Sequence, residues 1–395
     1  METMQPVLKR GRDVWDRINM PQSEFQERVE KIKKEMEKED LDVLLLYGRG
    51  VNEYGNSCYA SNFVIGMQRG ALVAIPRKGE IALIFEGFPR ALPTVRTKTW
   101  IKEIRACGNI SRECVKYLKE GNFIPSTIGL AGLKQLMPYH QLRFLRESLS
   151  QCKIVDSSDI IEDMRMVKSR RECDEIHRSS RILAQAFSSI SNFDIPSSNM
   201  NEKVLEAIMG REAYLEGAED FRMLVARPLE GKWAFRPAED AQILPEGSII
   251  VYLAVEFERY WSEGIRTFVV NHSSFTEPEF ERGKALYESI ISRMKPGKTL
   301  SQFYKEAIEE IQKSGIDYMP EYGLGQGIGL SLQEPPVIAE EDMNQLRDGM
   351  CLTLRLAMKD KGVGAIVMGN TIHLLKGRSE VLTKLIKVVE RKEES

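Results

Sequence analysis

The C-terminal half of the chain contains two pairs of long strand patterns, and these constrain its fold more than any other feature. The first pair comprises residues 249–257 and 260–270, and the second comprises residues 350–358 and 364–374. Only a few residues separate the two members of each pair, which is the spacing expected of β-hairpins. The intervening helical patterns cover residues 277–294 and 300–314. We therefore predict an α+β domain in which helices cover a curved antiparallel sheet.

The N-terminal part of the chain has a different pattern, in which helical and strand segments alternate as far as Val155. The elements expected there include a helix that starts at the capping-box residues Ser23 and Gln26, and strands at 41–48, 70–76 and 80–86. The tripeptide Arg77-Lys78-Gly79 lies between the last two strands and indicates a hairpin. This alternation predicts an α/β domain.

The polar segment at residues 156–159 is the predicted domain boundary, because a new helical pattern follows it. That pattern begins with a second capping box at Ser169 and Glu172. The length of 395 residues also favours about two domains. We expect an N-terminal arm at 1–22, an α/β N-terminal domain at 23–156 and the α+β C-terminal domain at 160–391.

The composition is that of a folded protein and excludes two classes of partner. Hydrophobic residues make up 42% of the chain, too many for a disordered sequence. The 56 basic and 58 acidic side chains give a net charge of -2, so no bulk charge attracts nucleic acid or anionic lipid. No apolar stretch approaches the ~20 residues that span a bilayer, and the N-terminus is charged where a secretory signal is apolar. We expect a soluble, cytoplasmic protein without nucleic-acid or membrane partners.

Cysteine, histidine and glycine patterns do not by themselves indicate a cofactor site. The cysteines are Cys58, Cys107, Cys114, Cys152, Cys173 and Cys351, without CxxC spacing. The histidines are His140, His177, His272 and His373, and none is paired with another at ligand spacing. Each is interpreted as a surface or packing residue rather than a ligand or general base, with His373, in a C-terminal strand, as the best candidate for an exception. The glycine-dense run 323–329 lacks the Lys-Ser/Thr of a phosphate-binding loop, so we interpret it as a close-packed sheet segment.

Several sequence blocks carry a resemblance to a known family. In the first long hairpin the relevant residues are Tyr260, Arg266, Thr267 and Phe268. Further blocks in the same order are Gly325–Leu330 with Glu334-Pro335-Pro336, Gly349-Met350 with Thr353, and Thr371 with Glu380–Thr383. These residues resemble the motifs of the pita-bread family, which includes aminopeptidase P, prolidase, methionine aminopeptidase and creatinase. The N-terminal domain is similar to that of creatinase and prolidase, so the resemblance extends from about residue 23 over nearly the whole chain.

The resemblance also implies that the chemistry of the pocket differs from that of the family's peptidases. Those enzymes hold two divalent metal ions with two Asp, one His and two Glu side chains. At the corresponding positions this chain has Tyr252, Glu263, Gln326, Arg355 and Gly369. Four clustered carboxylates need the charge of two ions, whereas Glu263 and Arg355 neutralise one another. We therefore predict no metal ligands and no cofactor.

Two interpretations of this altered pocket remain open. In a rebuilt pocket, Glu263 acts as general acid or base, assisted by amide donors of Gln326 and of Gln333, which stands where the family has a further histidine. The predicted substrate-binding residues are Arg355, Tyr252, Phe235, Trp233 and Glu334, with Arg355 binding a substrate carboxylate through two hydrogen bonds. In a decayed pocket, Glu263 and Arg355 form an internal ion pair that fills the cavity.

Three functions follow from these interpretations. The first is a metal-independent hydrolase or lyase that acts on a small carboxylate-bearing amide or amidino substrate, in the manner of a creatinase-like C–N hydrolase. The alternative is a non-catalytic family member that serves as a binding or partner subunit. The third, a metal-dependent Xaa-Pro peptidase, requires ligands that the sequence lacks. The resemblance also implies a homodimer, to which the arm at 1–22 and the apolar segment 63–67 could contribute.

Overall fold

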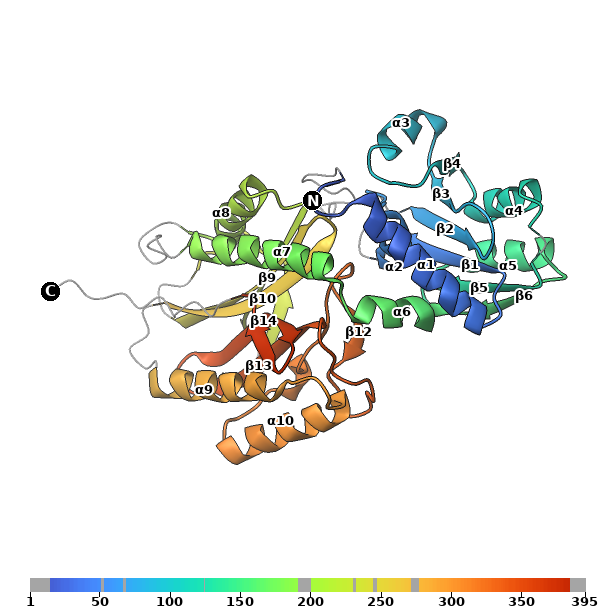
Figure 1. Cartoon of the computed structure of the whole chain (residues 1–395). Coiled ribbons are helices and arrows are strands. Elements are labelled where there is room, and N and C mark those ends of the chain that lie inside the picture. The colour runs from blue at the N-terminus through green and yellow to red at the C-terminus, as the bar shows by residue number, and fades with distance from the viewer. Residues whose placement is uncertain are drawn as a thin grey trace. The chain divides into compact units, whose positions relative to one another are not determined.

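The computed structural model describes eight stretches of the chain, namely residues 15–50, 53–66, 69–123, 125–190, 200–229, 232–243, 247–270 and 277–383. The chain divides into two compact units, Met1–Arg165 and Met166–Ser395, each built around its own sheet (Figure 1). This division falls a few residues after the polar segment 156–159, because α6 (Ser158–Met166) lies almost entirely in the first unit. Residues 1–14 of the expected arm, Met67 of the expected contact segment, and residues 384–391 lie outside the described stretches.

The first unit contains a six-stranded mixed sheet in the order β4-β3-β2-β1-β5-β6. The strands are β1 (Val43–Arg49), β2 (Gly70–Pro76), β3 (Ala82–Glu86), β4 (Glu103–Cys107), β5 (Thr127–Ala131) and β6 (Lys153–Asp156). The helices are α1 (Gln22–Lys38), α2 (Gly55–Ser61), η1 (Pro89–Ala91), α3 (Leu92–Val95), α4 (Ile110–Glu120) and α5 (Tyr139–Ser148). The pairs β1–β2 and β2–β3 are antiparallel, and the remaining pairs are parallel.

The sequence predicted most of this unit, with one correction at the first helix. The hairpin of β2 and β3 is confirmed. The capping box at Ser23 and Gln26 is wrong, because α1 begins at Gln22 and its N-cap is Pro21, which makes no side-chain cap bond. Proline is compatible with a helix start because its fixed φ already suits that position.

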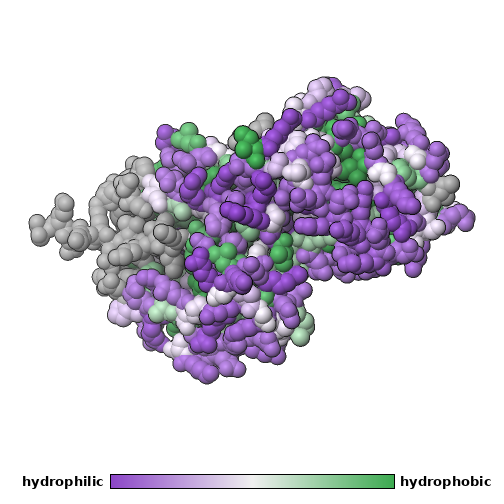
Figure 2. All heavy atoms as spheres, viewed as in Figure 1, coloured by the Kyte–Doolittle hydropathy of each residue, from purple (hydrophilic) through white to green (hydrophobic). Residues whose placement is uncertain are grey.

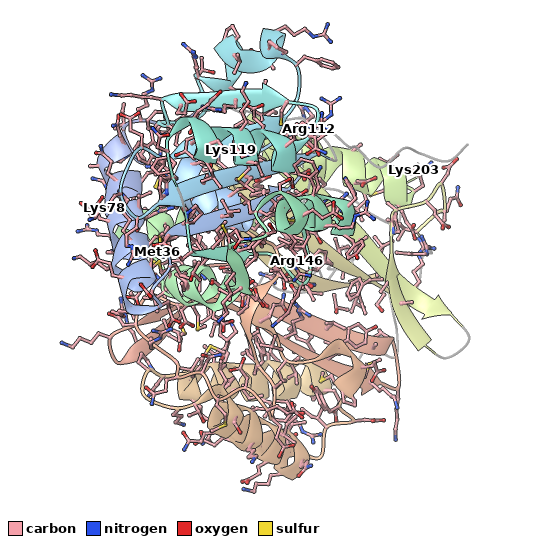
Figure 3. The ribbon with its side chains drawn as sticks, turned by 90° about the vertical axis from the view of Figure 1, so that its right-hand side faces the viewer. Met36, Lys78, Arg112, Lys119, Arg146 and Lys203 are labelled. Atoms are coloured by element: carbon pink, nitrogen blue, oxygen red, sulfur yellow. The ribbon has the colours of Figure 1, made fainter. Side chains whose placement is uncertain are left out.

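Helices α4 and α5 pack on the sheet of the first unit through apolar residues such as Leu118 and Leu145. Their charged side chains, including Arg112, Lys119 and Arg146, are exposed on the side that faces the viewer (Figure 3). This separation of apolar and charged faces is what amphipathic helices on an α/β sheet require.

The second unit contains a nine-stranded antiparallel sheet in the order β12-β11-β13-β14-β10-β9-β7-β8, with β15 paired to β14. The strands are β7 (Asp220–Leu229), β8 (Lys232–Arg236), β9 (Gly247–Phe257), β10 (Tyr260–Val270), β11 (Gln326–Gly327), β12 (Glu334–Val337), β13 (Cys351–Asp360), β14 (Gly364–Leu375) and β15 (Arg378–Val381). The helices are α7 (Arg170–Ser188), α8 (Glu202–Leu215), α9 (Glu277–Arg293), α10 (Leu300–Ser314) and η2 (Pro320–Tyr322). The two predicted hairpins are confirmed as β9–β10 and β13–β14, and the predicted helices as α9 and α10.

Register places the helices on one face of this sheet. Residues directly opposite one another in a ladder share a face, so Tyr252, Ile265, Gly369 and Arg355 form one row across four strands. Their chain neighbours point to the other face, where one apolar cluster packs against α7 and α8 and a second packs against α9 and α10. The apolar sides of all four long helices therefore pack on one face, and the row through Tyr252 and Arg355 lies on the opposite face. At the end of the β13–β14 ladder, the start of α7 also contacts Cys351 and His373, which are on the same face as Arg355.

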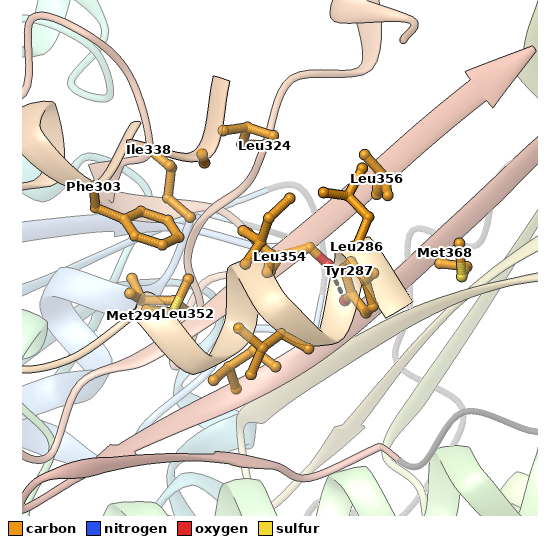
Figure 4. Close-up of a cluster of buried hydrophobic side chains, with 14 of the residues drawn as sticks. Leu286, Tyr287, Met294, Phe303, Leu324, Ile338, Leu352, Leu354, Leu356 and Met368 are labelled. Carbon is orange, nitrogen blue, oxygen red and sulfur yellow. Dashed lines mark hydrogen bonds between the residues drawn. The ribbon is translucent and has the colours of Figure 1, made fainter. Parts of the chain in front are cut away.

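The larger apolar cluster fixes β13 and β14 against α9 and α10. Leu352, Leu354 and Leu356 alternate along β13 and pack with Tyr287 and Phe303 of the two helices (Figure 4). The Tyr287 hydroxyl is fully buried and donates a 2.7 Å hydrogen bond to the Leu354 carbonyl oxygen (Figure 4). This buried packing makes the ends of β13 and β14 a rigid support for the side chains on the opposite face.

Hydrophilic residues cover most of the face shown in Figure 2, over both units. The large hydrophobic side chains exposed in the described stretches include Phe88 and Met343. Among the residues that the structure describes, no helix is both long enough and apolar enough to cross a bilayer.

Candidate functional site

The central residues of the predicted pocket come together on the helix-free face of the second sheet. Tyr252 lies on β9, Glu263 on β10 and Arg355 on β13. Gly369 of β14 pairs with Arg355 on one side and with Ile265 on the other. Gln326 enters from the short strand β11, which lies between β12 and β13. The sequence placed these five positions in one pocket, and their positions in the sheet agree with that prediction.

Glu263 is the buried acid of the pocket, with a side chain only 3% exposed. Its Oε2 accepts a 2.8 Å hydrogen bond from the Tyr252 hydroxyl. Its Oε1 accepts hydrogen bonds from Nη2 and Nε of Arg355, at 2.9 and 3.3 Å. Burial, together with the charge of Glu263 and the hydrogen bond to it, raises the pKa of Tyr252 well above its usual value. Tyr252 therefore stays protonated and acts as a donor to the carboxylate.

Gln326 completes the chain of polar contacts and leaves one donor unused. Its Oε1 accepts a 2.5 Å hydrogen bond from Nη2 of Arg355. Its Nε2 is buried and has no hydrogen-bond partner, although the residue is only 9% exposed. A buried N–H without an acceptor is costly, and a bound ligand oxygen would remove that cost.

Two threonines fix the backbone on which Glu263 and Gln326 are carried. The Thr371 hydroxyl accepts from the Glu263 amide at 3.0 Å and donates to the Glu263 carbonyl at 2.9 Å. The Thr353 hydroxyl accepts from the Gln326 amide at 3.2 Å. Thr353 and Thr371 are themselves a cross-strand pair, one row beyond Arg355 and Gly369. The pocket is therefore held by the sheet rather than by loops.

The glycine-dense run reaches the pocket because it packs directly on β13. A Cβ atom on Gly325 would lie 2.0 Å from the carbonyl oxygen of Thr353, and this residue has a φ of +144°. Only glycine fits such a backbone approach. This observation confirms the interpretation of residues 323–329 as close-packed and places Gln326 beside Arg355.

Aromatic side chains border the polar chain. Phe235 packs edge-on against Tyr252 and against Tyr322, with ring centroids 6.1 and 5.8 Å apart. The carbonyl oxygen of Tyr322 also accepts a 3.5 Å hydrogen bond from Nη1 of Arg355. Sequence reasoning missed Tyr322, although it directly precedes the glycine-dense run. The side chain of Trp233 lies outside the part of the chain that is described.

Two of the predicted residues have other surroundings. Gln333 is exposed in the turn before β12. Glu334 is buried, and its Oε1 accepts a 2.8 Å hydrogen bond from Lys168, with both side chains only 2% exposed. The Glu334 carboxylate also accepts from the Ser331 amide at 3.3 Å. Glu334 is therefore engaged in an internal ion pair.

The fold and the sequence together define the class of this protein. An α/β unit is followed by a unit with a curled antiparallel half-barrel sheet and covering helices, which is the pita-bread fold and confirms the predicted fold class. Residues 28–167 match the Creatinase/Prolidase N-terminal domain, and residues 174–375 match Metallopeptidase family M24. The second match covers half of the chain. The chain belongs to metallopeptidase family M24.

Several proteins similar to this chain are dipeptidases. The Xaa-Pro dipeptidase of Pyrococcus furiosus is 22% identical over 372 residues, which are 91% of this chain and 98% of that protein. The Xaa-Pro dipeptidase of Pyrococcus horikoshii is 24% identical over 280 residues, 68% of this chain and 78% of that protein. The crystal structure of the prolidase from Pyrococcus horikoshii OT3 has a TM-score of 0.76 at 22% identity, and covers 91% of this chain and 99% of that one. At this identity the structural likeness establishes the fold.

The family name implies divalent metal ions, and the pocket residues do not fit them. Glu263 is the one carboxylate among the five pocket positions, and the guanidinium of Arg355 already neutralises it at 2.9 Å. A cation bound to Glu263 would lie beside a fixed positive charge, which is unfavourable in a buried site. Amide, phenol and guanidinium groups are not the carboxylate and imidazole donors that divalent ions prefer.

Proposed function

We propose that this chain is a metal-independent hydrolase or lyase that acts on a small carboxylate-bearing substrate with an amide or amidino C–N bond. The observation that carries the proposal is the unpartnered Nε2 of Gln326, buried next to Arg355 and Glu263. Within one contact network the pocket offers an anion-binding guanidinium, a free amide donor and a carboxylate. A substrate with a carboxylate and an adjacent carbonyl or amidino group complements this set.

For a hydrolase, each group has a defined task. Arg355 binds the substrate carboxylate, and Nε2 of Gln326 donates to the oxygen or nitrogen that gains charge at the attacked carbon. Glu263 removes a proton from water, whose oxygen bonds to that carbon. Glu263 then returns the proton to the leaving nitrogen as the C–N bond breaks. Tyr252 orients the carboxylate through its 2.8 Å hydrogen bond.

The test is a screen of N-acyl amino acids and amidino acids, with amine and ammonia release as the readout. For any substrate found, Glu263→Gln should lower kcat by about 100-fold or more, because it removes the acid–base group but keeps the shape. Arg355→Gln should raise KM more than it lowers kcat. The matched control is Glu309→Gln at an exposed site, which should leave both constants unchanged. Unchanged turnover in Glu263→Gln would refute the assigned role.

Two of the assigned residues rest on the family resemblance alone. Gln333 is proposed as a second amide donor and Trp233 as part of the pocket wall. Replacing each with alanine in the same assay tests these roles, because a pocket residue should change KM or kcat for the substrate found. Glu334 is proposed to act on substrate binding only through its ion pair with Lys168.

A specific observation favours the second function, a non-catalytic binding or partner subunit. The ion pair of Arg355 and Glu263 is already closed, as expected if the pocket has lost its reaction. Under this alternative, calorimetry with the same compounds would show either no binding at all or binding without any turnover. Turnover that depends on Glu263 would exclude it.

The names of the relatives favour the third function, a metal-dependent Xaa-Pro dipeptidase. If this function is correct, the protein hydrolyses Xaa-Pro dipeptides, and the rate depends on added Mn²⁺, Co²⁺ or Zn²⁺. We expect no such activity, because a guanidinium lies where the cation would bind. The homodimer and the cytoplasmic location expected from the sequence are further proposals, and sedimentation at several concentrations tests the dimer.

A further inference from the structure

A second cluster of reactive side chains lies at the beginning of α7. The capping box of Ser169 and Glu172 is confirmed and fixes the first turn of this helix. Cys173 follows one residue later, and His177 stands four residues beyond it. Side chains separated by four residues project from one face of a helix, so Cys173 and His177 point to the same neighbour.

That neighbour is the end of the β13–β14–β15 ladder. Cys351 of β13 pairs directly with His373 of β14, and His373 pairs directly with Glu380 of β15. These three residues therefore form a cross-strand row with side chains on one face. The row is separated from Arg355 and Gly369 by the pair Thr353 and Thr371, so this cluster is distinct from the pocket around Glu263.

Helix and ladder bring the ligand atoms together. The donor atoms of Cys173, Cys351 and His373 all lie within 4.8 Å of one another, as do those of His177, His373 and Glu380. Nε2 of His177 is 3.1 Å from Nδ1 of His373. Cys173, Cys351 and His373 are 6%, 0% and 7% exposed, and neither cysteine is in a disulfide. The sequence did not indicate this contact, because 196 residues separate His177 and His373 along the chain.

We propose that Cys173, Cys351, His373 and His177 bind one Zn²⁺ ion in a tetrahedral site. Zinc prefers sulfur and imidazole nitrogen at about 2.3 and 2.0–2.1 Å, which places the ligand atoms of a tetrahedral site about 3.3 to 3.8 Å apart. The limit of 4.8 Å within the Cys-Cys-His group is compatible with three of these positions. Nε2 of His177, 3.1 Å from Nδ1 of His373, belongs to the neighbouring group with His373 and Glu380, so His177 has to turn toward the two thiols to become the fourth ligand. Glu380 lies next to the histidines and is placed to hold a ring N–H, as carboxylates do beside zinc-bound imidazoles.

The charges agree with this assignment. Two thiolates and one Zn²⁺ sum to zero, so the filled site carries no net charge into a buried region. Thiols bind zinc as thiolates, so binding releases protons and the affinity depends on pH. The ion would join the first turn of α7 to β13 and β14, and the proposal does not depend on the function of the Glu263 pocket.

The competing interpretation of the same residues is a disulfide between Cys173 and Cys351. A disulfide would leave the two histidines and the adjacent carboxylate without a role, whereas a metal ion uses both thiols and both imidazoles. Zinc therefore accounts for more of the cluster, and the test separates the two outcomes.

The experiment measures zinc and cobalt in the full-length protein, purified under reducing conditions without chelator. We expect one equivalent of zinc, and after replacement by Co²⁺ the thiolate-to-cobalt absorption and the visible bands of a tetrahedral site. Cys173→Ser and Cys351→Ser should each weaken zinc binding by more than about 100-fold, and His177→Ala by about 10-fold or more. The matched controls are Cys107→Ser, at a half-buried thiol outside the cluster, and His140→Ala, at an exposed histidine, and neither should change the metal content.

Three results would overturn the proposal. These are a chain that binds no zinc while all six thiols react, a Cys173–Cys351 disulfide found by mass spectrometry, or zinc retained in Cys173→Ser/Cys351→Ser. The cobalt spectrum of the unaltered chain needs no variant, so the test remains decisive if a cysteine variant fails to fold. Loss of activity at the Glu263 pocket would not affect these readouts.

Discussion

At the scale of single residues, charge compensation determines what the pocket can do. In the pocket, one guanidinium and one carboxylate face each other. Relatives of this chain are named Xaa-Pro dipeptidases, and the chain itself belongs to a metallopeptidase family. The sequence predicted this contact, because glycine and methionine anchors flank Gln326 and Arg355 and fix their positions. It did not predict the contact of Tyr322. The backbone oxygen of this residue, at the end of η2, accepts a hydrogen bond from Arg355.

The Glu263–Arg355 pair can be measured directly. Arg355→Met should lower the free energy of unfolding by about 2–4 kcal/mol, because it leaves the buried carboxylate without its partner. Arg355→Met/Glu263→Leu should cost less than the sum of the two single changes, with a coupling of about 1–3 kcal/mol. Urea unfolding of the four proteins provides the values. Strict additivity would show that the two charges do not interact.

Glu334 is the residue whose predicted role changed most, since Lys168 binds it in a fully buried ion pair. Lys168→Met should destabilise the chain by about 3–5 kcal/mol, and the further change Glu334→Leu should restore much of this loss. The control is Lys313→Met, which breaks an exposed pair with Glu309 and should change stability by less than about 1 kcal/mol. Equal effects at the two sites would contradict the assigned burial.

At the scale of elements, periodicity and spacing were sufficient for the long hairpins and for α7, α9 and α10. They were not sufficient for α8, β7 and β8, because these sequences lack a clear period. Strand β7 is fixed by pairing with β9, β8 by pairing with β7, and α8 by packing against α7. The cysteine–histidine cluster was also missed. Its members are far apart in the chain, and only the β13–β14 register and the docking of α7 bring them together.

The short strand β11 depends on Gly325, since a side chain there would collide with the backbone of β13. Gly325→Ala should destabilise the protein by about 3 kcal/mol or more, through both the close contact and the φ of +144°. Gly108→Ala, at an exposed glycine where an added Cβ would have no atom within 4 Å, should stay within about 0.5 kcal/mol. Thermal unfolding compares the two. A small effect at Gly325 would mean that β11 can move away from β13.

At the scale of the whole molecule, the second sheet has one face that packs and one that can react. The apolar sides of all four long helices pack on the first face, and the second face carries the polar side chains of Tyr252, Glu263 and Arg355. Alternation along each strand makes this division visible in the sequence, and the family motifs mark where the row lies. The identity of the ligand depends on a few side chains in the pocket. For this reason the sequence predicts the fold in more detail than the function.

The most direct test of the metal-free pocket is an anomalous difference map from crystals grown with Mn²⁺ or Co²⁺. We predict no anomalous peak within bonding distance of Glu263, and continuous density for the Arg355–Glu263 ion pair. Two strong peaks between Glu263 and Gln326, with Arg355 displaced, would contradict this prediction and establish the pocket as a dinuclear metal centre.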